Sequence, residues 1–153
     1  MIDSKLCGNE KDLNLIQKVQ LAKEQDNMDT VNYWYGNNYN KIHKSCREII
    51  AQQESNCFIL AEEYVSLLVD SIHKADLSGF RERFQDPDIL VIDGVDFVFS
   101  GKESSQEELL FLLRKRNDMG KTTYLTGFNA PSANCFIQPL CMLIENGQVR
   151  QFE

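Results

Sequence analysis

The chain has 153 residues, 42% hydrophobic and 25% charged, which is enough for one packed core and too little for two full domains. Its net charge of −7, from 23 acidic and 16 basic residues, repels nucleic acid unless local basic groups overcome it. Five cysteines without a C-x-x-C pair indicate free thiols, not a disulfide framework or a zinc site, and no apolar run approaches the length of a membrane span. We therefore expect one cytoplasmic domain without membrane association.

The first third of the chain alternates between helical patterns and short apolar runs. We expect residues 1–11 to be a flexible N-terminus because they are polar. The predicted elements that follow are a helix capped by Asp12 and ending near residues 25–27, a buried strand over 31–35 closed by Gly36, a helix over about 42–53 and a second buried strand over 56–61.

The middle of the chain predicts two consecutive helices and then a strand. The helices lie within residues 62–84, with an apolar face on the first and an Asp86-Pro87 turn after the second. Residues 88–93, "DILVID", place four apolar residues between carboxylates, which is typical of a parallel strand covered on both faces. Asp93 then emerges at the carboxyl end of this strand.

The rest of the chain predicts one helix, one strand and a hairpin. Ser104 and Glu107 form the pattern of a capping box at the start of a helix. Gly120, which readily adopts the left-handed conformation, predicts the end of this helix. On this helix we interpret the basic run at residues 114–116 as a solvated face. Residues 122–127 read as a strand, and the alternation around Asn146-Gly147 predicts a β-hairpin.

This order of elements predicts a three-layer α/β domain with a mostly parallel sheet and a C-terminal β-hairpin. Ligands of such sheets bind at the carboxyl ends of the strands. Three of the predicted loops there carry polar residues, namely Gly36 to Lys41, Asp93 and Thr126. We therefore expect a functional site at this edge.

The loop "GNNYNKI" partly matches the phosphate-binding pattern G-x-x-x-x-G-K-S/T. It keeps Gly36 and Lys41 but is one residue shorter, with Asn40 in place of the second glycine and Ile42 in place of the hydroxyl that holds magnesium. Gly94 follows Asp93 where a second carboxylate would orient the attacking water. A plain strand-to-helix turn and an ordinary strand-end carboxylate remain alternative interpretations.

Three stretches together resemble the AAA+ ATPase core of the bacterial replication initiator DnaA family. They are the paired helices of residues 62–84 placed directly before "PDILVID", then "FSGKESSQEE", then "GKTTYLTGFNAP". Extended upstream, the resemblance implies a P-loop NTPase-like core over residues 12–131, with residues 132–153 as a hairpin packed on the same domain. No lid, trans-acting arginine or helix-turn-helix is recognisable after Pro131.

The resemblance also implies site residues. Gly36, Asn40 and Lys41 correspond to the phosphate loop, Asp93 to the magnesium-side aspartate, and Thr126, or Asn129 beside it, to the loop that senses the γ-phosphate. Val69 and Lys102 match positions that contact single-stranded DNA in the initiator. Because the phosphate loop is degenerate, we expect no ATP hydrolysis. We expect the chain to bind no cofactor, and binding of ATP or ADP with magnesium is the less favoured alternative.

We interpret the chain as a DnaA-like core without ATPase activity that acts as a protein-binding or regulatory module in control of DNA replication initiation. Its partner would be another protein, either a replication initiator or a second copy of this chain. The alternatives are a non-hydrolysing nucleotide switch, a single-stranded DNA-binding protein, which the net charge disfavours, and a relic domain without a retained site.

Overall fold

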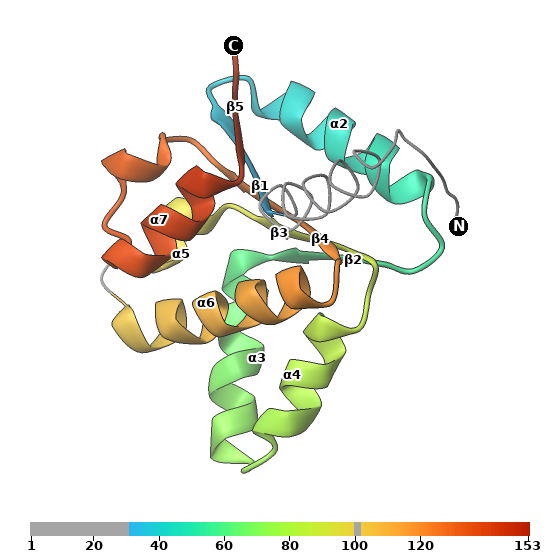
Figure 1. Ribbon diagram of the computed structural model, residues 1–153, viewed down its shortest axis with the longest axis vertical. Helices are drawn as coiled ribbons and strands as arrows, with labels where there is room; N and C mark the ends of the chain where they lie inside the picture. The colour runs from blue at the N-terminus through green and yellow to red at the C-terminus, as the bar shows by residue number, and fades with distance from the viewer. Residues whose placement is uncertain (1–30, 100–101) are drawn as a thin grey trace, which may run out of the picture.

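The computed structural model describes residues 31–99 and 102–153, and there five parallel strands form one sheet with helices on both faces (Figure 1). The strands are β1 (Val31–Gly36), β2 (Asn56–Leu60), β3 (Ile89–Asp93), β4 (Thr122–Gly127) and β5 (Gln148–Phe152), in the spatial order β2-β3-β4-β1-β5. The helices are α2 (Tyr39–Ala51), α3 (Ala61–His73), α4 (Leu77–Gln85), α5 (Val95–Phe99), α6 (Glu103–Asp118) and α7 (Gln138–Asn146), with a 3-10 turn η1 (Pro131–Ala133). The predicted three-layer α/β fold is confirmed, while the flexible N-terminus and the helix expected to end near residues 25–27 lie outside the described residues.

The apolar residues of β3 contribute to two hydrophobic cores, one on each face of the sheet. Leu90 and Ile92 join the larger cluster under α3 to α7, whereas Ile89 and Val91 pack on the α2 side. Since successive side chains of a strand point to opposite faces, a continuous apolar run is what a strand between two helical layers requires. Every residue of β3 is buried, as predicted.

The expectation that β2 is a buried strand is wrong. β2 pairs only with β3 and forms one edge of the sheet, so Phe58 and Leu60 stay 43% and 41% exposed. A short apolar run does not reveal whether a strand lies inside a sheet or at its edge.

The predicted C-terminal hairpin is also wrong. Residues 138–146 form α7, which buries Leu140 and Ile144 on one face, and β5 then pairs with β1 in parallel. Gly147 ends the helix at φ −89°, not in the left-handed conformation that an Asn-Gly hairpin turn needs. Burial of an i, i+4 apolar pair therefore outweighs the local turn signal.

The predicted capping box on α6 is not formed. The helix begins at Glu103 with Lys102 as its N-cap residue, so Ser104 already lies in the first turn. Gly120 does adopt the predicted left-handed conformation, at φ 71°. No helix within the described residues is long and apolar enough to cross a membrane.

Arg116 on α6 is buried, so the interpretation of residues 114–116 as a solvated face is wrong at this position. Its guanidinium donates to the carbonyls of Phe84 (3.0 Å) and Pro87 (2.7 Å), which precede β3 in the chain. It also donates to the carbonyl of Thr122 (2.8 Å) and the hydroxyl of Thr123 (2.7 Å) on β4. Burial lowers the pKa of Arg116 to about 10. The side chain thus ties α4, α6 and the starts of two strands together.

Candidate functional site

Asp93 and Thr126 come together at the carboxyl ends of β3 and β4. The Thr126 hydroxyl donates to Asp93 Oδ1 at 2.5 Å, and the backbone N–H of Gly94 donates to Thr126 Oγ1 at 3.0 Å. Both side chains are buried, Asp93 being 6% exposed. The structure therefore brings together two of the predicted site residues at one sheet edge.

Two further groups from α2 contact the same carboxylate oxygen. Tyr39 Oη donates to Asp93 Oδ1 at 2.9 Å, and His43 Nε2 lies 2.9 Å from Oδ1. Tyr39 and His43 are four residues apart and so share one face of the helix. Sequence reasoning missed both, although their i, i+4 spacing directly after a strand was a usable signal.

Aromatic rings cover this carboxylate. The Tyr39 ring stacks on Phe128 with centroids 4.7 Å apart and planes at 14°, and it lies 4.4 Å from the His43 ring. Burial, together with the adjacent Asp93, raises the pKa of Tyr39 above its ordinary value, so its hydroxyl stays protonated at neutral pH. Asp93 therefore lies under stacked aromatic rings, and the hydroxyl of Tyr39 donates to it.

The residues of the predicted phosphate loop are placed differently. The Asn38 side chain accepts the N–H of Lys41 at 3.2 Å and caps α2, so Asn40 and Lys41 lie in the first helical turn with exposed side chains. Ile42 is buried in the core beside Cys46. Among the described residues, no hydrogen bond or ion pair joins Lys41 to Asp93.

Gly36 adopts φ 135° where β5 runs closely past it. A Cβ on this residue would lie 2.0 Å from the carbonyl oxygen of Phe152. In addition, Asn38 Nδ2 donates to the carbonyl of Glu153 at 3.2 Å. The glycine is therefore required by the packing of β5, whether or not a phosphate binds.

The loop after β4 is fixed by a buried carboxylate that the sequence did not single out. Asp96 Oδ2 accepts the N–H groups of Phe128 (2.7 Å) and Asn129 (2.8 Å), and Tyr33 Oη donates to the carbonyl of Asn129 at 2.7 Å. These contacts hold the backbone of Asn129. No group of three potential metal-ligating side chains gathers within the part of the chain that the structure describes.

Val69 and Lys102, the predicted DNA-contacting residues, lie on different elements. Val69 is 44% exposed on α3, and Lys102 is exposed at the start of α6. Lys102 lines an open cleft of about 650 Å³ that Val69 does not line. We call this the strand-end cleft; its wall includes Tyr39, Leu60, Glu62, Val65, Asp93 and Lys102.

The bacterial DnaA ATPase domain model matches residues 6–139. The chain belongs to this family. A chromosomal replication initiator protein DnaA from Synechococcus sp. (strain JA-2-3B'a(2-13)) is 29% identical over 97 residues, which are 63% of this chain and 21% of that protein. The match covers between 15% and 21% of the length of the first curated DnaA relatives.

Solved DnaA structures share the fold. Domain III of the Thermotoga maritima replication initiation protein DnaA superposes with a TM-score of 0.73 at 26% identity, covering 90% of this chain and 60% of that one. A replication initiator DnaA bound to AMPPCP and single-stranded DNA has a TM-score of 0.72 at 20% identity, covering 92% and 46%. The predicted DnaA-like AAA+ core is thereby confirmed.

Proposed function

We propose that this DnaA-family domain does not hydrolyse ATP and that it acts by binding another protein in the control of DNA replication initiation. The observation that carries the proposal is the set of partners around Asp93. Tyr39, His43 and Thr126 all contact Oδ1 at 2.5–2.9 Å. Only Oδ2 of Asp93 is then left for a magnesium ion or for a water bound to it, so the site offers such an ion half of the carboxylate.

Three further residues support the absence of turnover. Gly94 stands where the carboxylate that orients the attacking water would be, and buried Ile42 replaces the hydroxyl that would bind magnesium. Lys41 is the one cation kept from the phosphate loop, and its side chain is exposed. The residues present therefore do not fit a magnesium–ATP complex poised for hydrolysis.

A protein partner agrees better with the charge than nucleic acid does. The net charge of −7 opposes the approach of a phosphate backbone but not that of a basic protein surface. We place the domain in the bacterial cytoplasm, with an initiator protein or a second copy of this chain as its partner.

The thermal midpoint and ATP turnover test this proposal together. Millimolar ATP with magnesium is added to the wild type, to Lys41→Ala and to Lys44→Ala, an exposed lysine one turn further along α2. We expect no shift and no phosphate release in any of the three. Saturation at 100 times the dissociation constant would add about 2.7 kcal/mol of stability, several degrees for a domain of this size.

A different result would select the second candidate, a non-hydrolysing nucleotide switch. A DnaA structure with AMPPCP bound favours this candidate. Its signature is a thermal shift without turnover that disappears in Lys41→Ala and persists in Lys44→Ala. Phosphate release by the wild type above that of Asp93→Asn would contradict both candidates.

A third candidate, single-stranded DNA binding through Val69 and Lys102, draws on the same DnaA structure, which also contains single-stranded DNA. Both side chains are exposed here, but Glu103 directly follows Lys102. A steep fall of oligothymidine affinity with salt, lost in Lys102→Ala, would favour this candidate.

A further inference from the structure

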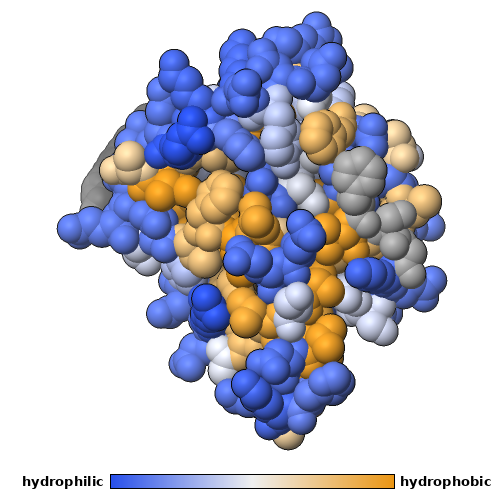
Figure 2. Space-filling model, turned by 180° about the vertical axis from the view of Figure 1, so that it is seen from behind, coloured by the Kyte–Doolittle hydropathy of each residue, from blue (hydrophilic) through white to orange (hydrophobic). Residues whose placement is uncertain are grey.

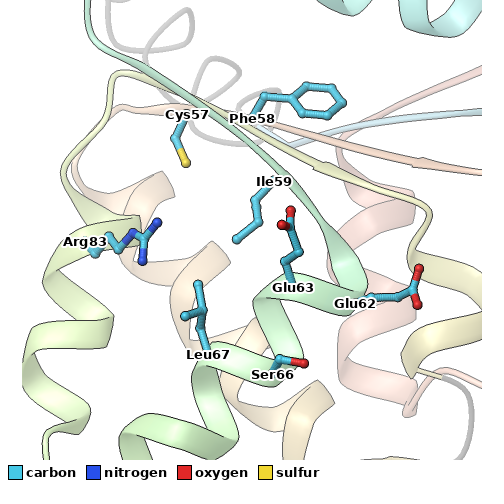
Figure 3. Close-up of a pocket in the computed structure, with 8 residues that line it drawn as sticks. All are labelled: Cys57, Phe58, Ile59, Glu62, Glu63, Ser66, Leu67 and Arg83. Atoms are coloured by element: carbon cyan, nitrogen blue, oxygen red, sulfur yellow. The ribbon is translucent and has the colours of Figure 1, made fainter.

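A second cleft lies beside the strand-end cleft, on the other side of the first turn of α3. We call it the edge cleft; it has a volume of about 580 Å³ and is lined by residues that include Phe58, Ile59, Glu62, Glu63, Leu67 and Arg83 (Figure 3). Glu62 and Ser66 line both clefts. The two hollows are therefore neighbours along one surface that runs from β2 over α3 to Asp93.

This surface is apolar along a strand edge. Phe58 and Leu60, two residues apart on β2, expose 43% and 41% of their area, and each lines one of the two clefts. β2 pairs only with β3, so its outer backbone groups have no strand partner among the described residues, although the N–H of Leu60 donates to Glu63 Oε1 at 3.4 Å. An extended segment can join such an edge, and alternate side chains of that segment then point to one face. Apolar side chains also gather over the middle of the face in Figure 2, down towards the end where α3 and α4 lie.

The charge at the junction of the clefts is negative. Glu62 is exposed and forms no ion pair with a described residue, and Glu63 stands beside it on α3. Arg83 lies at the opposite end of the edge cleft (Figure 3). In the strand-end cleft the partners of Asp93 all contact Oδ1, and no hydrogen bond from the described residues reaches Oδ2.

We propose that the two clefts bind an extended segment of a partner protein in which apolar residues alternate with lysine or arginine. The apolar side chains pack on Phe58 and Leu60, and a cationic side chain reaches the exposed carboxylate of Glu62 beside the ring of Tyr39. This inference rests on the proposed protein-binding function and names the class of partner.

Carboxylates at the junction distinguish this occupant from nucleic acid. A phosphate backbone would approach Glu62, Glu63 and Asp93 with only Arg83 and Lys102 as cations among the residues that line the clefts. A basic peptide segment carries the opposite charge, so its cations find three carboxylates against these same two cations.

Fluorescence anisotropy with a synthetic probe tests the inference. The probe is a fluorescein-labelled heptapeptide of alternating lysine and valine, and its counterpart carries glutamate in place of lysine. We expect the full chain to bind the lysine peptide and not the glutamate peptide. Glu62→Lys should weaken binding about tenfold or more, whereas Glu48→Lys, an exposed position on α2 that lines neither cleft, should change it less than about twofold.

A second pair of variants tests the strand edge. Phe58→Lys on β2 should also weaken binding about tenfold, while Val149→Lys, on the other edge strand and 41% exposed, should not. Equal binding by wild type and Glu62→Lys, no binding by wild type, or displacement of the peptide by oligothymidine would each overturn the inference.

ATP turnover measured on the same preparation separates this inference from the proposed function. A chain that hydrolyses ATP and still binds the lysine peptide through Glu62 would overturn the absence of turnover and leave the clefts assigned. A chain that neither hydrolyses ATP nor binds the lysine peptide would overturn only the proposal that the clefts bind such a segment.

Discussion

Arg116 gives the sharpest residue-scale prediction. All three nitrogens of its planar guanidinium donate hydrogen bonds to surrounding oxygens. Lysine has only one nitrogen and is unable to reach the same oxygens together. Arg116→Lys should therefore leave buried carbonyls without donors and lower the unfolding free energy by about 2–4 kcal/mol. Urea denaturation measures this loss.

Arg114 is the matched control because it is an exposed arginine on the same helix. Arg114→Lys should change the unfolding free energy by less than about 0.5 kcal/mol. Equal midpoints for the two variants would mean that the hydrogen bonds of Arg116 add nothing to stability.

The candidate site was only partly predictable from single residues. Asp93 and Thr126 could be found because strand-end residues of a parallel sheet meet at one edge. Tyr39 and His43 were missed because residues 36–42 were compared with a phosphate loop, which directs attention to Lys41. Burial of Arg116 depends on carbonyls about 30 residues away, which no local pattern contains.

At the scale of elements, Gly36 should be the least replaceable glycine of the sheet. A Cβ there meets the β5 backbone at 2.0 Å, and φ 135° is strained for any other residue. Gly36→Ala should therefore cost about 2–4 kcal/mol. The change in urea midpoint, with amide exchange of residues 148–152, measures the effect.

Gly120 provides the comparison for this variant. It also has positive φ, at 71°, but an added Cβ finds no atom within 4 Å. Gly120→Ala should cost only about 1 kcal/mol. A similar loss in both variants would show that the contact with β5 has no energetic weight.

The elements that could be predicted carry their signal in the local sequence. β3 was recognised from four consecutive apolar residues and α6 from apolar residues along one helical face. The tail was misread because Asn146-Gly147 is a strong signal over two residues, whereas pairing of β5 with β1 is decided far along the chain. The edge position of β2 likewise depends on the whole sheet.

At the scale of the whole molecule, the buried thiol of Cys46 should make the free energy of unfolding fall as the pH becomes alkaline. Burial, reinforced by the nearby charge of Asp93, raises the pKa of this thiol to about 12. In the unfolded chain a thiol titrates near 8.5. The unfolded state therefore loses its proton first, and stability falls by about 1.4 kcal/mol per pH unit between these values.

Denaturation of wild type and Cys46→Ala at pH 7 and pH 10 measures this effect. At pH 7 the wild type should be more stable by about 1–2 kcal/mol, and at pH 10 this advantage should shrink by about that amount. Cys135→Ala, at an exposed thiol, should show the same difference from wild type at both pH values. A pH-independent advantage of Cys46 would contradict the prediction.

The place of β5 beside β1 also bears on the time course of folding. Asn38, just after β1, bonds a carbonyl 115 residues later, so the partner of β1 on this side leaves the ribosome long after β1 itself. Closing so long a loop is slow compared with forming the helices between the two strands. Until then the aromatic strand "VNYWY" has an open edge. During synthesis, this nascent edge therefore needs protection from aggregation.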